Sequence, residues 1–413
     1  MECEGTRRWW KPGPPPQPNW DSVTIPSVSE SHPTVARAAA LAPRLLESAR
    51  RTEQAQRVLP EHFDALAEAG VFRMAGPAKY GGGEADFQTQ CDVLAHLARG
   101  CPSTSWVATI FSAMAWLAGT FPDEAQEELL GSGDPRISGV FSPTGTAMPV
   151  EGGYRVSGRW GFNTGGQGSD WTVLHAVEGH GESATSHCVV VRSTELSRLD
   201  DWHASGMAGT GSHTVVADDV FVPAYRSMPL VAMLNATYPD NRHNAANPFF
   251  NLPLAAVLTV NGGGTPVGIA QGAREAFLQR LPGRGITYTT YAVQAEAAIT
   301  HLQVGEASLL IDSADSHVRR ATSLLDDLSA LPLSTQSRVK ARGHVAYATG
   351  LARQAVDLLF HGSGASAIQP HVPIQRFQRD MQALANHAVM HAPTGIELYG
   401  RILCGLEPNT LLY

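Results

Sequence analysis

The sequence predicts an α+β fold in which one β-rich segment lies between two helical segments. Residues 33–136 carry apolar side chains at helical spacing, residues 137–222 are rich in Val, Thr and Gly, and helical periodicity returns from about residue 253. This order predicts four parts of the chain: a disordered Pro-rich leader over 1–30, a helical domain over 31–136, a central β-domain over 137–240 and a C-terminal helical bundle over 241–413.

The first domain is predicted as a series of helices. Apolar residues recur at helical spacing after Val35, and a second helix begins after Pro60 and ends at Gly70. A third helix covers 85–99. The hydroxyl residues 103–105 are suited to capping the start of a fourth, because their side chains can accept hydrogen bonds from free backbone N–H groups.

The β-domain and the bundle are predicted from changes in residue composition and in the spacing of apolar residues. Short alternations interrupted by turns such as Glu151-Gly152-Gly153 are typical of strands. The bundle is predicted from long Ala- and Leu-rich segments with few prolines, namely Ala270–Leu281, Gln294–Leu325 and Thr335–Leu359.

Composition and charge limit the class of protein. A formal net charge of -8 and a pI near 6.0 argue against nucleic acid, which requires a basic surface. No apolar run reaches the roughly 18 residues that a membrane span needs. Five cysteines are far apart and include no C-x-x-C pair, which favours free thiols in a reducing cytoplasm.

The leader contains Trp9-Trp10 and a proline run over 12–16. It lacks the apolar core of about 7–15 residues that a secretory signal requires. Pro-rich composition of this kind predicts disorder. The alternative is an arm whose tryptophans dock on a neighbouring subunit.

Four blocks in order resemble the acyl-CoA dehydrogenase superfamily over roughly residues 30–410. Each block alone is a weak signal, whereas all four in the same order are a strong one. They are Pro77-x-x-Tyr80-Gly81-Gly82 with residues 97–103, residues 156–165, residues 206–223, and Phe360–Gly364 with Pro373–Asp380.

The last block departs from the dehydrogenase pattern. Many dehydrogenases of that fold follow the Arg-Asp pair with Tyr-Glu, and the Glu is the base, but here those positions read His387 and Ala388. The chain therefore resembles the two-component flavin-dependent monooxygenase branch. That resemblance implies the acyl-CoA dehydrogenase fold, with a helical N-domain, a central β-domain and a C-terminal four-helix bundle, assembled as a homotetramer.

The resemblance also implies the chemistry. Reduced FAD or FMN would be supplied by a separate flavin reductase, because no G-x-G-x-x-G follows a predicted strand to bind a nicotinamide. Dioxygen would be the co-substrate, and one oxygen atom would pass to a small organic molecule through a flavin C4a-hydroperoxide.

The same blocks imply the site residues. Thr164 and His387 are the expected catalytic residues: the hydroxyl would lie beside the flavin N5, and the imidazole would bind the hydroperoxide or accept a substrate proton. Trp106 and His391 are expected substrate contacts, and no metal site is expected, since a His-x-x-x-His pair supplies only two ligands. The expected flavin-binding residues are Phe141, Ser142, Phe162, Asn163, Thr164, Arg284, Gly362, Ser363 and Gly364.

The substrate is not readable from these blocks. Hydroxylation and N-oxidation both remain open, and segments such as 247–253 are closest to amino-sugar N-oxygenases and natural-product hydroxylases, which favours a role in natural-product biosynthesis. Two rival functions also remain: an acyl-CoA dehydrogenase whose base has moved to Glu275 or Glu306, and a non-catalytic scaffold of the same fold.

Overall fold

The computed structural model describes residues 32–413. The predicted leader, with its tryptophans, lies outside the described residues. In the described part the chain begins with five α-helices: α1 (Pro33–Gln54), α2 (Pro60–Glu68), α3 (Phe87–Gly100), α4 (Pro102–Ala118) and α5 (Asp123–Leu130).

One sheet follows the helices, in the strand order β5-β6-β2-β1-β3-β4-β7. Only β1 and β3 pair in parallel among the neighbouring strands of the described chain, and the other pairs are antiparallel. The strands are β1 (Ile137–Val150), β2 (Gly153–Trp160), β3 (Trp171–Glu178), β4 (Thr185–Arg192), β5 (Ser197–Arg198), β6 (Val215–Pro223) and β7 (Ser227–Pro229).

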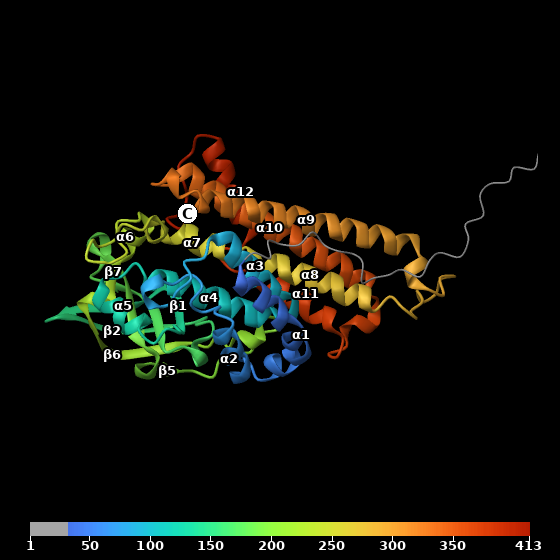
Figure 1. Ribbon diagram of the computed structural model, residues 1–413, viewed down its shortest axis with the longest axis horizontal. Coiled ribbons are helices and arrows are strands. Elements are labelled where there is room, and N and C mark those ends of the chain that lie inside the picture. The colour runs from blue at the N-terminus through green and yellow to red at the C-terminus, as the bar shows by residue number, and fades with distance from the viewer. Residues whose placement is uncertain (1–31) are drawn as a thin grey trace, which may run out of the picture.

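Helices make up the rest of the chain. Figure 1 shows the sheet at one end of the molecule, the N-terminal helices in the middle and the long later helices running side by side toward the other end. These helices are α6 (Leu230–Leu234), α7 (Leu254–Asn261), α8 (Gly264–Gln279), α9 (Ala298–Asp326), α10 (Thr335–Gly362), α11 (Pro373–Ala385) and α12 (Ala392–Leu403).

Helix α8 begins six residues earlier than its predicted start at Ala270. Its first turns contain Gly264 and Gly268, which favour a turn in isolation. In the fold both glycines face α3, and a Cβ atom at either would collide with the carbonyl of Cys91 or Ala95. Close packing of two helices therefore overrides the low helix propensity of glycine.

A bulge interrupts the pairing of β1 with β3. Val140 pairs with Leu174 and Gly145 pairs with Ala176, so four residues of β1 face a single residue of β3. The ring of His175 holds the bulge, because its Nδ1 lies 2.9 Å from the carbonyl oxygen of Phe141. Bulges of this kind redirect side chains, and this one carries Phe141 and Ser142.

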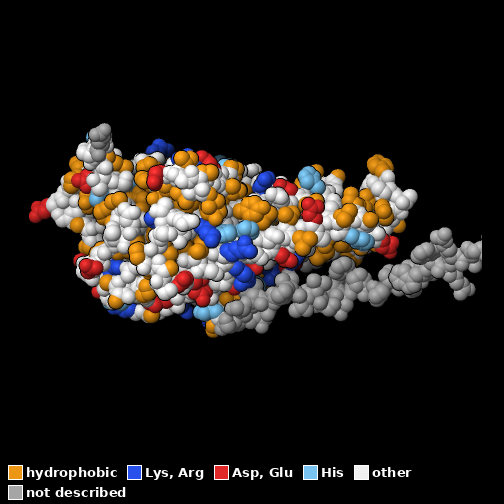
Figure 2. Space-filling model, turned by 90° about the horizontal axis from the view of Figure 1, so that it is seen from above, with side chains coloured by type: hydrophobic (Ala, Val, Ile, Leu, Met, Phe, Trp, Pro, Cys, Tyr) orange, Lys and Arg blue, Asp and Glu red, His pale blue; other side chains and the backbone are white. Residues whose placement is uncertain are grey.

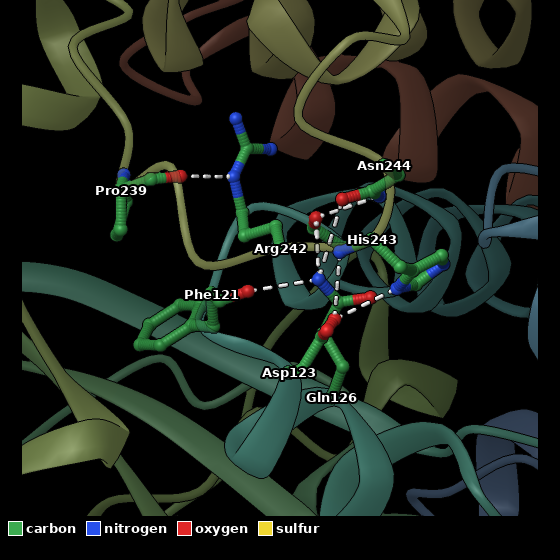
Figure 3. Close-up of polar contacts among 8 residues, drawn as sticks. Phe121, Asp123, Gln126, Pro239, Arg242, His243 and Asn244 are labelled. Atoms are coloured by element: carbon green, nitrogen blue, oxygen red, sulfur yellow. Dashed lines mark hydrogen bonds and ion pairs between the residues drawn. The ribbon is translucent and has the colours of Figure 1, made fainter.

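A partly buried polar network fixes the loop that leads into α7. Figure 3 shows the loop residues His243 and Asn244 meeting the start of α5, while Arg242 donates to the Pro239 carbonyl within the loop. The His243 backbone N–H donates to the Asp123 carboxylate at 2.9 Å, and the Gln126 side-chain amide donates to the carbonyls of Gly119 and Phe121. Because α7 follows this loop, the network holds α7 in place.

Replacing Gln126 with leucine is expected to destabilise the fold by about 1–3 kcal/mol, because Gln126 is fully buried and the Phe121 carbonyl loses its side-chain donor, whereas the Gly119 carbonyl keeps the amide of Asn244. Denaturant unfolding monitored by circular dichroism measures the difference. The control is Arg51→Ala, which removes the exposed Arg51–Glu61 ion pair and should change stability by less than about 1 kcal/mol. Equal effects of the two substitutions would contradict this account of the network.

Within residues 32–413, none of the helices combines the length and the apolar character that crossing a lipid bilayer requires.

Candidate active site

Two neighbouring cavities lie between the sheet and the helices. The wide cavity, about 770 Å³, is bounded by residues 202–207 and by the end of α11. The apolar cavity, about 370 Å³, lies between α4, α7 and the bulge of β1. The two cavities share five lining residues, which are Trp106, Ser142, Phe162, His387 and Ala388.

A chain of hydroxyl groups forms one wall of the wide cavity. Thr210 donates to the carbonyl of Met207 at 2.8 Å, and the Ser212 hydroxyl lies 2.7 Å from that of Thr210. Since the Thr210 hydrogen is already used, Ser212 must donate to Thr210. Ser212 can then only accept from Thr164, 2.9 Å away. The order leaves the Thr164 oxygen free to accept a hydrogen bond from a ligand in the wide cavity.

The loop that carries Thr164 has a strained backbone at Phe162 and is held in place by backbone hydrogen bonds. Phe162 has a positive φ of 63°, which is uncommon for a residue with a bulky side chain. Backbone hydrogen bonds join Asn163 to His213 at 3.2 Å and Gly165 to Thr210 at 2.9 Å. This conformation leaves the Phe162 ring 75% exposed at the rim of both cavities, with its centroid 5.8 Å from that of Trp202.

Asn163, expected to bind flavin, points elsewhere. Its side chain is buried, lines neither cavity, and packs so close to Gly166 that a Cβ there would meet the amide nitrogen. The neighbouring residue His213 is also buried, and its Nδ1 lies 3.9 Å from Asp201 Oδ1. Both side chains therefore belong to the packing behind the loop rather than to the cavity surface.

His387 lies in a turn and not in a helix, which corrects the helical interpretation of its pairing with His391. Helix α11 ends at Ala385, and the turn closes with a hydrogen bond from the His391 N–H to the His387 carbonyl at 2.9 Å. The imidazole meets the Trp106 ring edge-on, with the centroids 4.9 Å apart. The turn thus presents the imidazole where the two cavities meet.

Burial lowers the pKa of His387 to about 4, because removal from bulk water disfavours the imidazolium. The residue is nonetheless exposed where it lines the two cavities, so a molecule bound at their boundary can reach a ring nitrogen. The side chain is therefore a neutral imidazole at pH 7, with a nitrogen able to accept a proton.

The apolar cavity is lined mainly by apolar side chains, and the polar residues of its lining are Thr109, Ser142, Thr259 and His387. Phe141, an expected flavin-binding residue, lines the apolar cavity and is not among the lining residues of the wide one. Ser142 lines both. The apolar lining includes Ile110, Ala113, Met114, Val140, Leu230, Leu254, Leu258, Val389 and Leu412.

No aspartate or glutamate is among the residues that line either cavity in the described chain. Glu275, on α8, forms an ion pair with Arg99 at 2.8 Å, and Glu306 is exposed on α9. Neither carboxylate lines the cavities, so neither is placed to remove a proton from a molecule bound there.

The remaining expected residues lie apart from the two cavities. His391 lines a separate polar cavity of about 450 Å³, together with Arg342 and Glu397. Arg284 donates to the Ser363 carbonyl at 2.8 Å beside Gly364, whose φ is 67°. Arg342 contacts Ala388, and from Arg342 to Gly362 helix α10 rises about 30 Å. We call Arg284, Ser363 and Gly364 the Arg284 cluster. Within one chain this cluster and the two cavities are therefore at different ends of α10.

Comparisons with known proteins agree with this architecture. The family model described as acyl-CoA dehydrogenase, N-terminal domain, matches residues 34–130, and the one described as acyl-CoA dehydrogenase, C-terminal domain, matches residues 263–392. The chain is 31% identical over 388 residues to the FADH(2)-dependent resorcinol hydroxylase, oxygenase component, of Rhizobium sp. (strain MTP-10005), covering 91% of this chain and 95% of the relative.

The chain belongs to the acyl-CoA dehydrogenase family.

This family member falls in the flavin-dependent monooxygenase branch. It is 33% identical over 367 residues to the flavin-dependent monooxygenase, oxygenase subunit HsaA, of Rhodococcus jostii (strain RHA1), covering 87% of this chain and 95% of the relative. The crystal structure of 3-HSA hydroxylase from Rhodococcus sp. RHA1 matches with a TM-score of 0.85 and 31% identity, over 93% of this chain and 99% of that one.

A second solved structure carries a cofactor. XiaF from Streptomyces sp., in complex with FADH2 and glycerol, matches with a TM-score of 0.84 and 31% identity, over 91% of this chain and 96% of that one. The expected fold and the expected enzyme class, a flavin-dependent monooxygenase, are thereby confirmed. The expectation of a reduced flavin with dioxygen is confirmed at the level of this branch.

Sequence reasoning missed part of the cavity surface of this monooxygenase. Ser212 and Thr210 stand within the block Gly-Thr-Gly-Ser-His, where their hydroxyls could have been noticed as partners for Thr164. Leu258 and Leu412 carried no signal of their own, because a leucine that lines a cavity has the same local pattern as one in the core.

Proposed function

We propose that this chain is an oxygenase component that receives reduced flavin in the wide cavity and hydroxylates an aromatic substrate held in the apolar cavity. The observation that carries the proposal is the shared boundary of the two cavities, where the neutral imidazole of His387 lies and where no carboxylate is among the described lining residues. When bound, reduced flavin supplies the electrons with which dioxygen is activated for transfer of one oxygen atom.

The wide cavity suits a flavin in size and in chemistry. Its volume of about 770 Å³ lies in the range usual for small-molecule sites. Phe162 and Trp202 offer exposed aromatic surface to a flat ring. Thr164 offers an acceptor, which matches the N–H donor that only the reduced ring carries at N5. We infer that these residues hold the ring and favour its reduced form.

The apolar cavity favours an aromatic substrate over an amine. Its lining is mainly apolar and includes the Trp106 ring, which suits stacking and dispersion contacts with a ring. A protonated amine would lose its hydration there without gaining a carboxylate partner. Hydroxylation is therefore our proposal in preference to N-oxidation, and an aromatic intermediate of natural-product biosynthesis fits the resemblance seen in the sequence.

His387 is proposed to accept the proton of a phenolic hydroxyl. The imidazole is neutral at pH 7 and lies at the boundary between the bound ring and the wide cavity. Taking up that proton raises the electron density of the aromatic ring, which helps it attack an electrophilic oxygen. Trp106 and the apolar walls exclude water, so the activated oxygen meets substrate rather than solvent.

A partner chain is proposed to complete the flavin site. The Arg284 cluster lies about 30 Å along α10 from the turn that carries His387, so its expected role toward the flavin phosphates requires a second copy. Helix α9 exposes Ile299, Leu302 and Leu309, and Figure 2 shows hydrophobic side chains along the face seen from above. Such a surface favours burial against other copies in the expected homotetramer.

Mixed with a flavin reductase and NADH, the purified protein is expected to hydroxylate simple phenols, whereas alone it should oxidise neither NADH nor an acyl-CoA. The physical reason is that the described cavities hold no carboxylate to deprotonate an acyl-CoA. Mass spectrometry with isotopically labelled dioxygen measures whether the inserted oxygen comes from dioxygen. Bleaching of bound oxidised flavin by an acyl-CoA would instead favour the dehydrogenase. If the protein carries out neither reaction, the result favours a non-catalytic scaffold.

A further inference from the structure

The residues after α12 fold back over the helices. We call residues 404–413 the C-terminal strap. Asn409 donates to the Glu397 carboxylate at 3.1 Å, and the Arg401 guanidinium donates to the Glu407 carbonyl at 3.1 Å. Farther along, the Arg338 guanidinium lies 4.8 Å from the centroid of the Tyr413 ring. These contacts fasten the strap to α10 and α12.

One side chain of the strap completes the wall of the apolar cavity. Leu412 lines that cavity together with Leu230, Leu258 and Val389, which come from α6, α7 and the His387 turn. Leu412 and Ala388 also line the polar cavity of about 450 Å³ on the other side. Leu412 therefore stands between an apolar and a polar cavity. Its neighbour Leu411 is 78% exposed and lines neither of them.

A buried arginine joins the strap to the turn that carries His387. Arg342 is only 8% exposed, and it donates to the carbonyl of Leu412 and, at 3.4 Å, to that of Ala388. Among the described residues no carboxylate forms an ion pair with it. Both of its backbone partners are neighbours of the apolar cavity, so its guanidinium fixes two parts of the wall relative to each other.

We propose that Leu412 determines which aromatic substrates fit and that Arg342 is a positioning residue that ties the strap to the His387 turn. The proposal rests on the proposed function, because it assigns the apolar cavity to the substrate. Leu412 closes that cavity at about 370 Å³, which selects a phenol with a short apolar substituent. Removing its side chain would open a path into the polar cavity and admit longer substituents.

The test uses para-alkylphenols of increasing chain length, from methyl to octyl. For wild-type protein with reductase, kcat/KM is expected to fall once the alkyl chain exceeds the cavity. Leu412→Ala should move this limit to longer chains and raise KM for the shortest phenol by roughly tenfold, since hydrophobic contacts to it are lost. Leu412→Trp should move the limit to shorter chains. Leu411→Ala is the matched control and should keep the wild-type limit.

Equilibrium dialysis of the same phenols, with reduced flavin under anaerobic conditions, measures binding without turnover. The alkyl chain length at which the dissociation constant rises should be longer in Leu412→Ala than in wild type, shorter in Leu412→Trp, and unchanged in Leu411→Ala. An unchanged length limit in both Leu412 variants, with active wild type, overturns the role of Leu412 and leaves the proposed function intact. Failure of every variant, wild type included, to bind or hydroxylate any phenol overturns the proposed function and this inference with it.

The role of Arg342 is tested by Arg342→Met and Arg342→Lys. Hydrogen exchange should become faster in both the strap and residues 386–391 of Arg342→Met, while Leu411→Ala changes neither. For the shortest phenol, kcat should fall more than KM rises, because His387 is displaced, and Arg342→Lys should recover part of kcat. Faster exchange confined to the strap, with kcat unchanged, would refute the positioning role.

Discussion

Replacing His387 with alanine is expected to lower the rate of product formation by roughly 10²-fold or more, the usual scale for a positioned acid or base. The ring lines both cavities and meets Trp106 edge-on, so it touches whatever occupies their shared boundary. Without it the one other histidine of the described cavity lining is His203, which lines the wide cavity and not the apolar cavity proposed for the substrate.

The pH dependence provides a second measurement. Because burial lowers the pKa of His387 to about 4, the group is already neutral at pH 6 and above. Its contribution to the rate should be constant from there upward and should be lost only as the pH falls toward 4, where the imidazolium can no longer accept a proton. A histidine surrounded by bulk water would lose it near the ordinary pKa of about 6.5.

The control for His387 is His391→Ala. His391 lies four positions farther along the chain but lines the separate polar cavity, so its loss should leave the rate close to that of wild type. Size-exclusion chromatography of both variants excludes a change of assembly as the cause. A His387→Ala enzyme with wild-type rate and coupling would show that the imidazole has no part in catalysis.

Replacing Thr164 with valine is expected to release more hydrogen peroxide in place of product. Valine keeps the β-branched shape, so the pinned loop should survive. The lost hydrogen bond is worth about 1.5–3 kcal/mol in a dry site beside a charged or polarised group, which corresponds to roughly 10- to 150-fold in a rate. Peroxide released per dioxygen consumed measures this uncoupling, and flavin affinity should weaken only modestly.

Ser212→Ala provides the comparison for Thr164. This variant keeps the Thr164 hydroxyl but removes the acceptor 2.9 Å away that orients it. Uncoupling should therefore lie between wild type and Thr164→Val. An unchanged peroxide yield in Thr164→Val would place the flavin ring elsewhere and contradict the proposed arrangement of the wide cavity.

Four residues that the sequence blocks singled out lie together in the structure. Trp106, Ser142, Phe162 and His387 come from four distant segments, yet the structure brings all of them to the boundary between the two cavities. The same reasoning placed Asn163 and His391 by their neighbours in sequence. Sequence neighbours do not reveal that the Asn163 side chain packs behind its loop, or that His391 lines a different cavity after a turn.

By itself the sequence determined the order of helices and strands, since periodicity is a property of neighbouring residues. It also placed His387 and Ala388 where, by the resemblance, many dehydrogenases of this fold carry Tyr-Glu. Only the tertiary structure decided the protonation state of His387, the direction of the hydroxyl chain at Thr164 and the place of Leu412 in the cavity wall. The physical reason is that burial, hydrogen-bond order and cavity shape depend on residues that are far apart in the chain and meet only after folding.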